Sequence, residues 1–174
     1  MKTHAILHFI FGTILTGSLT LASQTSAQQT NQLTINQAKP TTMNSQPAQT
    51  VKNFLTAVQK GDNQTLAALI HPDIQWNQPG TNRFSGQKTS SAAVFHMVGD
   101  MFAATANTLS LADIKQITVN GNKVACLVRW KAAQPGGGVL DVNNIDVYTV
   151  ENGKIVEATV YSEDIAQEDG FWGK

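Results

Sequence analysis

One acidic residue in the last third of the chain lies in a pattern that could carry proton-transfer chemistry. The run Asn144-Ile145-Asp146-Val147-Tyr148 alternates as a β-strand does, and in a strand residues of one parity share a face. Asn144, Asp146 and Tyr148 are therefore expected to point to the same side. If that side faces a cavity, burial raises the pKa of Asp146 and its carboxyl can act as an acid. If it faces solvent, Asp146 is an ordinary surface charge.

His96 is a second candidate for acid–base work. It falls in a run with helical spacing, and its neighbour at i+4 is Asp100. A histidine in this place either packs as a partly buried residue or pairs with Asp100, or else it acts as a general base in a cavity. Packing or pairing with Asp100 is favoured, and the role of general base stays open.

The remaining reactive side chains give no sign of a metal or a nucleophile. Cys126 is the one cysteine, so no intrachain disulfide is possible, and its apolar surroundings predict a small buried side chain. No set of His, Cys and Asp residues has metal-ligand spacing. We therefore expect no metal and no cofactor.

Aromatic residues that could line a small-molecule cavity occur in several of the expected elements. They are Trp76, Phe84, Trp130 and Tyr161. An apolar cavity with a few polar groups suits a small molecule, but an ordinary hydrophobic core has the same signature in a sequence. Both interpretations of these aromatics stay open. Near the end of the chain, Phe171 and Trp172 are expected to fold back as a plug or to cover a dimer surface.

Three helices and five strands are expected to position these residues. Apolar residues at i, i+3, i+4 and i+7 predict helices over residues 47–60 and 89–106, and Asp62 can cap a short helix that reaches Ile70. Alternating or β-branched runs between turn signals predict the strands. They cover residues 73–78, 109–119, 123–132, 139–150 and 154–161. This order is typical of an α+β fold with helices on one face of a bent sheet.

The chain before residue 47 has the features of an exported protein. Residues 1–27 combine a basic start, an apolar stretch and small residues, as a secretory signal peptide does. Cleavage is expected after Ala27, with Ala22 as the alternative. Residues 28–46 are rich in Gln, Thr and Asn and predict a disordered spacer before one domain at 47–174. The mature protein is then expected to be periplasmic or secreted, with no membrane attachment.

The charge of the chain argues against nucleic acid as a partner. The sequence has 12 Lys and Arg residues and 12 Asp and Glu residues. Its basic residues are scattered, whereas proteins that bind nucleic acid gather them into a patch or stripe. A small hydrophobic molecule is the partner that the candidate residues favour.

Three segments give residues 47–174 a resemblance to a known superfamily. They are VKNFLTAVQKGD at 51–62, LIHPDIQW at 69–76 and VYTVENGKIVE at 147–157. With them the chain resembles the nuclear-transport-factor-2-like superfamily, and within it the SnoaL-like and ketosteroid-isomerase-like domains. The resemblance implies a cone-shaped, curved antiparallel sheet packed on three N-terminal helices. Such motifs mostly encode the fold and are poorly specific for activity.

The residues that would carry isomerase chemistry are incomplete. Ketosteroid isomerase uses a carboxylate base, with a Tyr and a protonated Asp that hold the developing oxyanion. By segment, the Tyr position is Phe54 and the base position is Gln78, while the oxyanion Asp falls at Asp146. Phe54 has no hydroxyl and the Gln78 amide is not a base, so steroid-type isomerisation is disfavoured. The candidates for ligand contact are Phe54, Trp76, Gln78, Trp130, Asn144 and Tyr161.

Two other branches of the superfamily imply other residues. SnoaL-like polyketide cyclases imply an acidic base near the end of the last strand, in a pocket without metal or cofactor, and Asp164 is the candidate there. The limonene-epoxide-hydrolase branch implies an Asp-Arg-Asp set around a water, for which Asp146, Arg129 and Asp164 are the residues to try. Taken by itself, Arg129 inside an apolar run predicts a structural ion pair with a carboxylate.

Two hypotheses for function follow. In the first, the domain is a non-catalytic exported module that binds a small ligand or forms a homodimer through the outer face of its sheet. In the second, it is a cofactor-free isomerase, cyclase or hydrolase, with Asp146 and Asp164 as acid and base and His96 assisting. The absent isomerase residues favour the first hypothesis. The second requires Asp164 to enter the cavity.

Overall fold

The computed structural model describes residues 45–174, which contain four helices and six strands. In chain order they are α1 (Gln46–Lys60), α2 (Asn63–Leu69), β1 (Ile70–Gln78), β2 (Gly86–Lys88), α3 (Ser91–Ala104), β3 (Ser110–Asn120), β4 (Lys123–Ala133), β5 (Val139–Glu151), β6 (Lys154–Ser162) and α4 (Ile165–Trp172). The expected signal peptide at 1–27 and nearly all of the expected spacer at 28–46 lie outside the described residues. Those two expectations stay predictions.

Short polar side chains set the starts of the helices. A side-chain oxygen accepts a hydrogen bond from a backbone N–H in the first turn of each helix, which satisfies a donor that the helix itself cannot. The capping residues are Ser45, Asp62, Ser90 and Asp164. At its other end α1 stops at Gly61, whose φ of 65° lies in the left-handed region that glycine adopts without strain.

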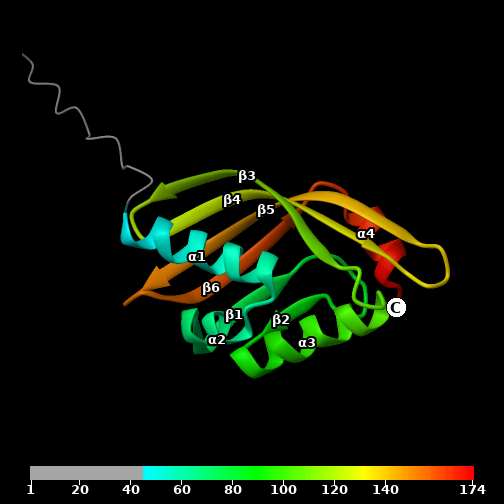
Figure 1. Ribbon diagram of the computed structural model, residues 1–174, viewed down its shortest axis with the longest axis horizontal. Helices are drawn as coiled ribbons and strands as arrows, with labels where there is room; N and C mark the ends of the chain where they lie inside the picture. Colours follow the sequence, from blue (N-terminus) through cyan, green and yellow to red (C-terminus); the bar gives the residue numbers. More distant parts are fainter. Residues whose placement is uncertain (1–44) are drawn as a thin grey trace, which may run out of the picture. The chain divides into compact units, whose positions relative to one another are not determined.

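Figure 1 shows one curved sheet with α1, α2 and α3 on the side toward which it bends. The strand order is β2-β1-β6-β5-β4-β3. This confirms the expected α+β class. The sheet is antiparallel apart from one pair, because β1 runs parallel to β6. A parallel pair needs a long crossover, and α3 together with the other strands supplies it.

Two of the elements, β2 and α4, were not expected from the sequence. β2 has three residues, too few to show any alternation, and pairs with β1 at the edge of the sheet. α4 follows β6, in a segment from which no helix was expected, although Phe171 and Trp172 were expected to fold back. The sequence does carry a signal for the start of this helix, because Gln167 follows the capping residue Asp164 by three positions. In the structure Asp164 accepts a hydrogen bond from the Gln167 N–H at 2.9 Å.

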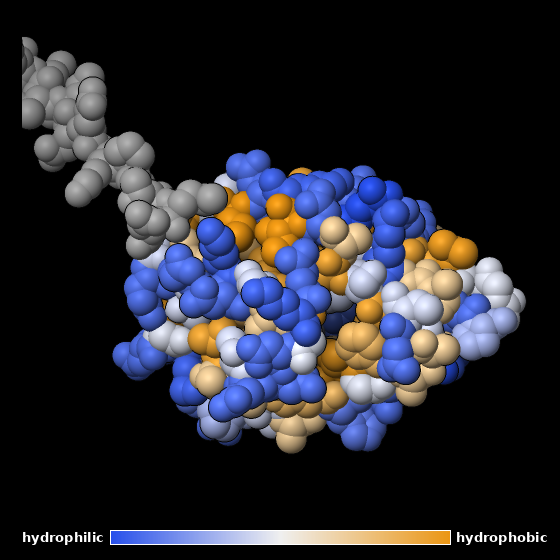
Figure 2. Space-filling view, viewed as in Figure 1, coloured by the Kyte–Doolittle hydropathy of each residue, from blue (hydrophilic) through white to orange (hydrophobic). Residues whose placement is uncertain are grey.

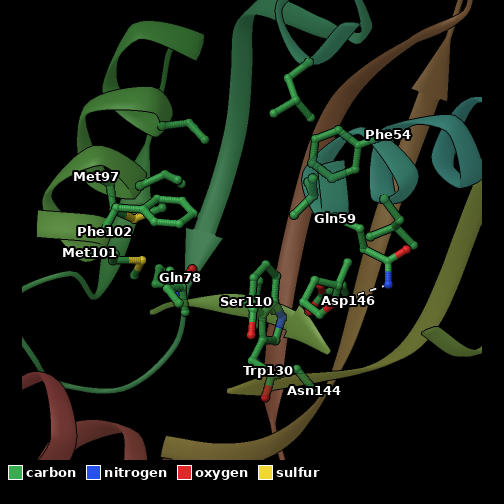
Figure 3. Close-up of a pocket in the computed structure, with 18 of the residues that line it drawn as sticks. Phe54, Gln59, Gln78, Met97, Met101, Phe102, Ser110, Trp130, Asn144 and Asp146 are labelled. Atoms are coloured by element: carbon green, nitrogen blue, oxygen red, sulfur yellow. Dashed lines mark hydrogen bonds between the residues drawn. The ribbon is translucent and has the colours of Figure 1, made fainter. Parts of the chain in front are cut away.

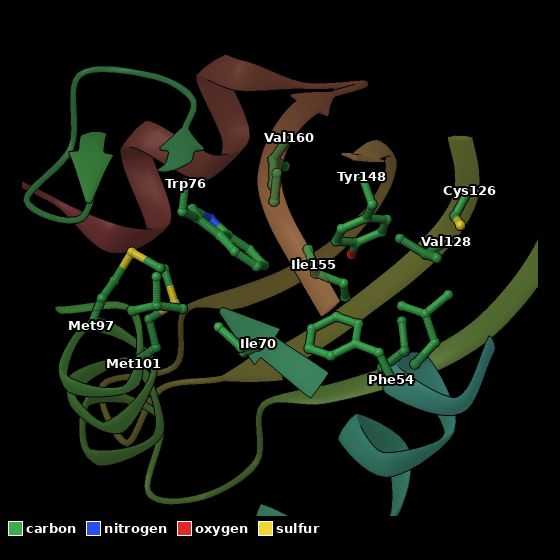
Figure 4. Packing of buried hydrophobic residues seen from close by; sticks show 14 of the residues in the cluster. Phe54, Ile70, Trp76, Met97, Met101, Cys126, Val128, Tyr148, Ile155 and Val160 are labelled. Carbon is green, nitrogen blue, oxygen red and sulfur yellow. The ribbon is translucent and has the colours of Figure 1, made fainter. Parts of the chain in front are cut away.

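The hydrophobic core fills the space between the helices and the inner face of the sheet (Figure 4). Phe54 of α1 packs edge to face on Tyr148 of β5, with ring centroids 5.5 Å apart, and Trp76 of β1 approaches the same tyrosine. Cys126 is fully buried, as expected, and burial raises the pKa of its thiol to about 12. The thiol therefore stays protonated and packs as a small apolar group.

The last helix covers one end of this core. Phe171 and Trp172 are buried and pack edge to face on each other, and Trp172 also packs on Phe84. The expected folding back of this pair as a plug is thus seen in the structure. Within residues 45–174 no helix is both long enough and apolar enough to cross a membrane.

Candidate functional site

A cavity of about 400 Å³ lies between α1, α3, α4 and the inner face of the sheet. The space-filling view shows a hollow on this face of the molecule, with hydrophobic residues on part of its border (Figure 2). Aromatic and methionine side chains make up much of its wall: Phe54, Trp76, Phe95, Met97, Met101 and Phe102. This is the kind of concave, mainly apolar space that holds small molecules in proteins.

Strand β5 brings a row of polar side chains to the cavity. Asn144, Asp146 and Tyr148 share one face, as their parity predicted, and that face is the inner one. In the sheet, Asp146 is flanked by Cys126 of β4 and Val160 of β6. Only 2 % of Asp146 is exposed. A carboxyl group therefore lies among apolar neighbours.

Burial gives Asp146 an unusual acidity. Burial, together with the nearby charge of Glu168, raises the pKa of the Asp146 carboxyl to about 7. The Tyr148 hydroxyl opposes this effect, because it donates a hydrogen bond of 3.0 Å to Oδ2 and favours the ionised form. Near neutral pH, Asp146 can therefore give up or take up a proton.

Glu168 of α4 is a second buried carboxyl at the cavity, with 2 % of its surface exposed. Burial raises its pKa, while the Ser162 hydroxyl and the Asn144 amide favour its ionised form. Three side-chain oxygens have no hydrogen-bond partner within residues 45–174: Asn144 Oδ1, Asp146 Oδ1 and Glu168 Oε1. All three belong to residues that line the cavity, which therefore has one polar end.

Two glutamines add polar groups elsewhere in the lining. Trp76 Nε1 donates to Gln78 Oε1 at 3.1 Å. This hydrogen bond uses the amide oxygen of Gln78 and not its N–H groups. Gln59 Nε2 donates to the Leu111 carbonyl at 3.2 Å. In Figure 3 the α3 side chains and the α1 side chains face each other across the cavity, with Asp146 and Trp130 between them.

The structure brings six of the expected site residues to one cavity. They are Phe54, Trp76, Gln78, Trp130, Asn144 and Asp146. Phe54 and Gln78 occupy the places where an isomerase would carry a hydroxyl and a base. Both line the cavity, and neither a phenyl ring nor an amide can transfer a proton there.

Three other expected site residues lie away from this cavity. Asp164 is exposed and caps α4. His96 is exposed on α3, with 80 % of its side chain accessible, and its Nδ1 lies 3.1 Å from Asp100 Oδ2. Tyr161 is 57 % exposed, because its parity places it on the outer face of β6. The condition that Asp164 enter the cavity is therefore not met, and catalysis by Asp164 with His96 loses its geometric basis.

Arg129 forms the structural ion pair that its sequence context predicted. Its Nε and Nη2 donate to the two oxygens of Asp141 at 2.6 and 2.7 Å. The arginine is thus engaged on the solvent side of β4, while Asp164 caps α4. The Asp-Arg-Asp set implied by the epoxide-hydrolase branch is not assembled at Asp146.

Sequence reasoning missed Glu168 as a site residue. A signal for it exists, because Glu168 precedes Trp172 by four residues, and residues at i and i+4 share one face of a helix. No helix was expected after residue 161, so this spacing was not used. Only its folding as α4 brings this carboxyl to Asn144 and Asp146.

Comparison with known proteins identifies the family of this chain. The model of the SnoaL-like domain family matches residues 51–158. Comparison with curated proteins gave no match.

Several solved structures share the fold. A protein with a cystatin-like fold from Xanthomonas campestris is 34% identical, with 74% of this chain and 98% of that chain covered and a TM-score of 0.71. Bal32a, from a soil-derived mobile gene cassette, is 26% identical, with 74% and 97% covered and a TM-score of 0.70. A candidate SnoaL-like polyketide cyclase from Jannaschia sp. is 17% identical, with 74% and 93% covered and a TM-score of 0.60. With its fold, its cavity and this family match, the chain belongs to the SnoaL-like domain family.

Proposed function

We propose that this domain binds a small, mainly apolar molecule in the cavity and holds a polar end of that molecule at Asn144, Asp146 and Glu168. The observation that carries the proposal is the set of three buried oxygens without partners in one apolar cavity. A buried polar group without a hydrogen bond is costly, and such groups are uncommon in folded proteins unless a ligand or water satisfies them.

The size of the cavity supports a ligand with a few rings or a short chain. A volume of about 400 Å³ lies at the lower end of the range for small-molecule sites. Its wall supplies apolar contact, and its one polar end would orient the ligand. One structural neighbour is described as a candidate SnoaL-like polyketide cyclase, which agrees with this proposal.

Proton transfer is a second candidate function, and one observation favours it. Asp146 has a pKa of about 7 inside an apolar cavity, and a group of that acidity can serve as a general acid or base at neutral pH. In this alternative the domain is a cofactor-free isomerase, cyclase or hydrolase for a small hydrophobic substrate. Glu168 then takes the place of the second carboxyl that was expected at Asp164.

A thermal-shift screen of the purified protein tests the binding proposal. Small apolar molecules with one polar end should raise the melting temperature of the wild type and of Asp164→Asn, whose carboxyl lies outside the cavity. The rise should be smaller for Asp146→Asn. Stabilisation by no compound, or the same shift for all three proteins, would overturn the proposal.

Two further proposals concern the protein as a whole. The N-terminal pattern supports export, with Gln28 as the first residue of the mature chain. Sequencing the N-terminus of protein recovered from outside the cytoplasm tests this, and an intact Met1 there would contradict it. The exposed apolar side chains on the outer face of the sheet support a homodimer, for which the test is given in the Discussion.

A further inference from the structure

The polar end of the cavity offers acceptors in excess of donors. Asn144 Oδ1, Asp146 Oδ1 and Glu168 Oε1 are buried without partners within residues 45–174. The hydroxyl proton of Tyr148 is already used, since it is donated to Asp146 Oδ2. When Asp146 and Glu168 are ionised, a ligand that completes this arrangement must therefore bring hydrogen-bond donors rather than acceptors.

The charges around these oxygens point the same way. The groups that act on Asp146 are Tyr148 on its own strand, Cys126 on β4 and Glu168 on α4. Those that act on Glu168 are Ser162, Asn144, Asp164 and Asp169. All of them are neutral or acidic. Of the described residues that line the cavity, Lys60 alone is basic, and it is exposed at the end of α1.

The wall of the cavity is suited to a cation with a hydrophobic body. The rings of Phe54, Trp76, Phe95, Phe102 and Trp130 all belong to it. The face of an aromatic ring attracts a cation, and the effect is larger where water is excluded. The same rings give apolar contact to the rest of a ligand.

From these three features we propose that the cavity takes a hydrophobic amine, whose ammonium N–H groups donate to Asn144, Asp146 and Glu168 while its apolar body lies against the aromatic wall. This inference rests on the proposed function, because it names the class of molecule that the same cavity binds. An ammonium has three donors for three acceptors. An alcohol has one, and a ketone has none.

Proton balance gives the proposal a definite pH dependence. The ammonium pairs with ionised Asp146, so any proton on that carboxyl leaves to solvent when the ligand binds. Asp146 has a pKa of about 7, and an ordinary alkylamine keeps its proton at neutral pH. Amine affinity should therefore rise as the pH increases through about 7, by up to about tenfold per pH unit below that value. The pKa of Glu168 is also raised, so ionisation of Glu168 should likewise increase amine affinity as the pH rises.

Calorimetry with a matched pair of probes tests this inference. The probes are 2-phenylethylamine and 2-phenylethanol, which have the same apolar body and differ in the polar end. At about pH 8 the amine should bind the wild type at least about tenfold more tightly than the alcohol, as expected for hydrogen bonds to charged groups. The preference should shrink at about pH 6.

Variants identify the residues responsible for the preference. Asp146→Asn and Glu168→Gln should each weaken amine binding by about tenfold and change alcohol binding by less than about threefold. Asp73→Asn is the matched control, because it removes one exposed carboxylate from β1 outside the cavity and should leave both affinities unchanged. Near-UV circular dichroism establishes that each variant is folded.

The outcomes separate this inference from the proposed function. Alcohol binding as tight as amine binding at both pH values would overturn the inference and leave the binding function standing. An amine preference that survives in both Asp146→Asn and Glu168→Gln would overturn it in the same way. If either variant does not fold, the pH dependence in the wild type still decides. If neither probe binds, the inference fails, and the thermal-shift screen decides whether the binding function fails with it.

Discussion

Asp146 owes its acidity to the strands on both sides of it. A carboxyl between Cys126 and Val160 in the sheet has apolar neighbours where a surface carboxyl has water. The hydrogen bond from Tyr148 offsets only part of the cost of charging it, so its pKa stays far above the ordinary value of 3.8. At the scale of single residues, the site is a buried carboxyl group whose pKa lies close to neutral pH.

The raised pKa of Asp146 predicts a loss of stability as the pH rises. Between about pH 4 and about pH 7 the folded protein holds a proton on Asp146 that the unfolded chain does not. The free energy of unfolding should therefore fall over this range, by on the order of 4 kcal/mol from this residue. Asp146→Asn should remove that part of the slope. Urea denaturation at several pH values measures it.

The comparison with a second variant makes this measurement specific. The pKa of Glu168 is also raised. Because of Glu168, the free energy of unfolding should still fall with rising pH in the wild type and in Asp146→Asn. Asp73→Asn removes an exposed carboxylate and should keep the wild-type slope. The same pH dependence in the wild type and in Asp146→Asn would contradict a raised pKa at Asp146.

At the scale of elements, α4 is the part of the fold that completes the cavity. Asp169 on this helix accepts hydrogen bonds from Thr81 N, Thr81 Oγ1 and Asn82 Nδ2, at 2.8 to 2.9 Å. A Cβ at Gly80 would lie within 2.2 Å of an Asp169 oxygen, so the loop before β2 is fitted to this carboxylate. Through these contacts the helix that carries Glu168 and Trp172 is attached to the edge of the sheet.

Removal of this attachment should loosen α4 selectively. Asp169→Ala deletes three accepted hydrogen bonds, so we expect faster hydrogen exchange in α4 and in residues 80–85, with little change in α1. Exchange measured by mass spectrometry reports both regions. Asp164→Asn is the control, because Asn caps a helix about as well as Asp does. Equal exchange in Asp169→Ala and the wild type would show that other contacts hold α4.

Helices α1 and α4 differ in how clearly the sequence predicts them. α1 buries a face whose apolar residues repeat at i, i+3, i+4 and i+7, so its pattern was visible. α4 is short, and its buried residues include Glu168, whose burial depends on contacts with β5 and β6. A local pattern cannot reveal a carboxyl that is buried only by distant strands.

At the scale of the whole molecule, the outer face of the sheet carries exposed apolar side chains. Ile145 is 48 % exposed, Tyr161 is 57 % exposed, and the two lie opposite each other on β5 and β6. Leu127 of β4 is the cross-strand partner of Ile145 on the other side. A group of apolar residues at the centre of a sheet face is suited to a contact with a second copy of the chain.

This face predicts a homodimer that a single charge should disrupt. Ile145→Lys should shift the protein from dimer to monomer, because it buries an unpaired charge at the centre of the contact. Size-exclusion chromatography with light scattering measures the mass. Val139→Lys also adds a charge at an exposed apolar residue, but at the end of the β4–β5 hairpin, and should leave the dimer intact. A wild-type mass that stays monomeric at all concentrations would sink the prediction.

The sequence by itself determined which residues share a face and where most helices and strands run. The side-chain period of two in β5 put Asn144, Asp146 and Tyr148 together, and helical spacing revealed α1 and α3, because both depend only on near neighbours in the chain. Tertiary structure decided which face of β5 is buried, and it placed Asp164 and Tyr161 outside the cavity and Glu168 inside it. Burial depends on which distant elements pack together, and a local pattern does not contain that information.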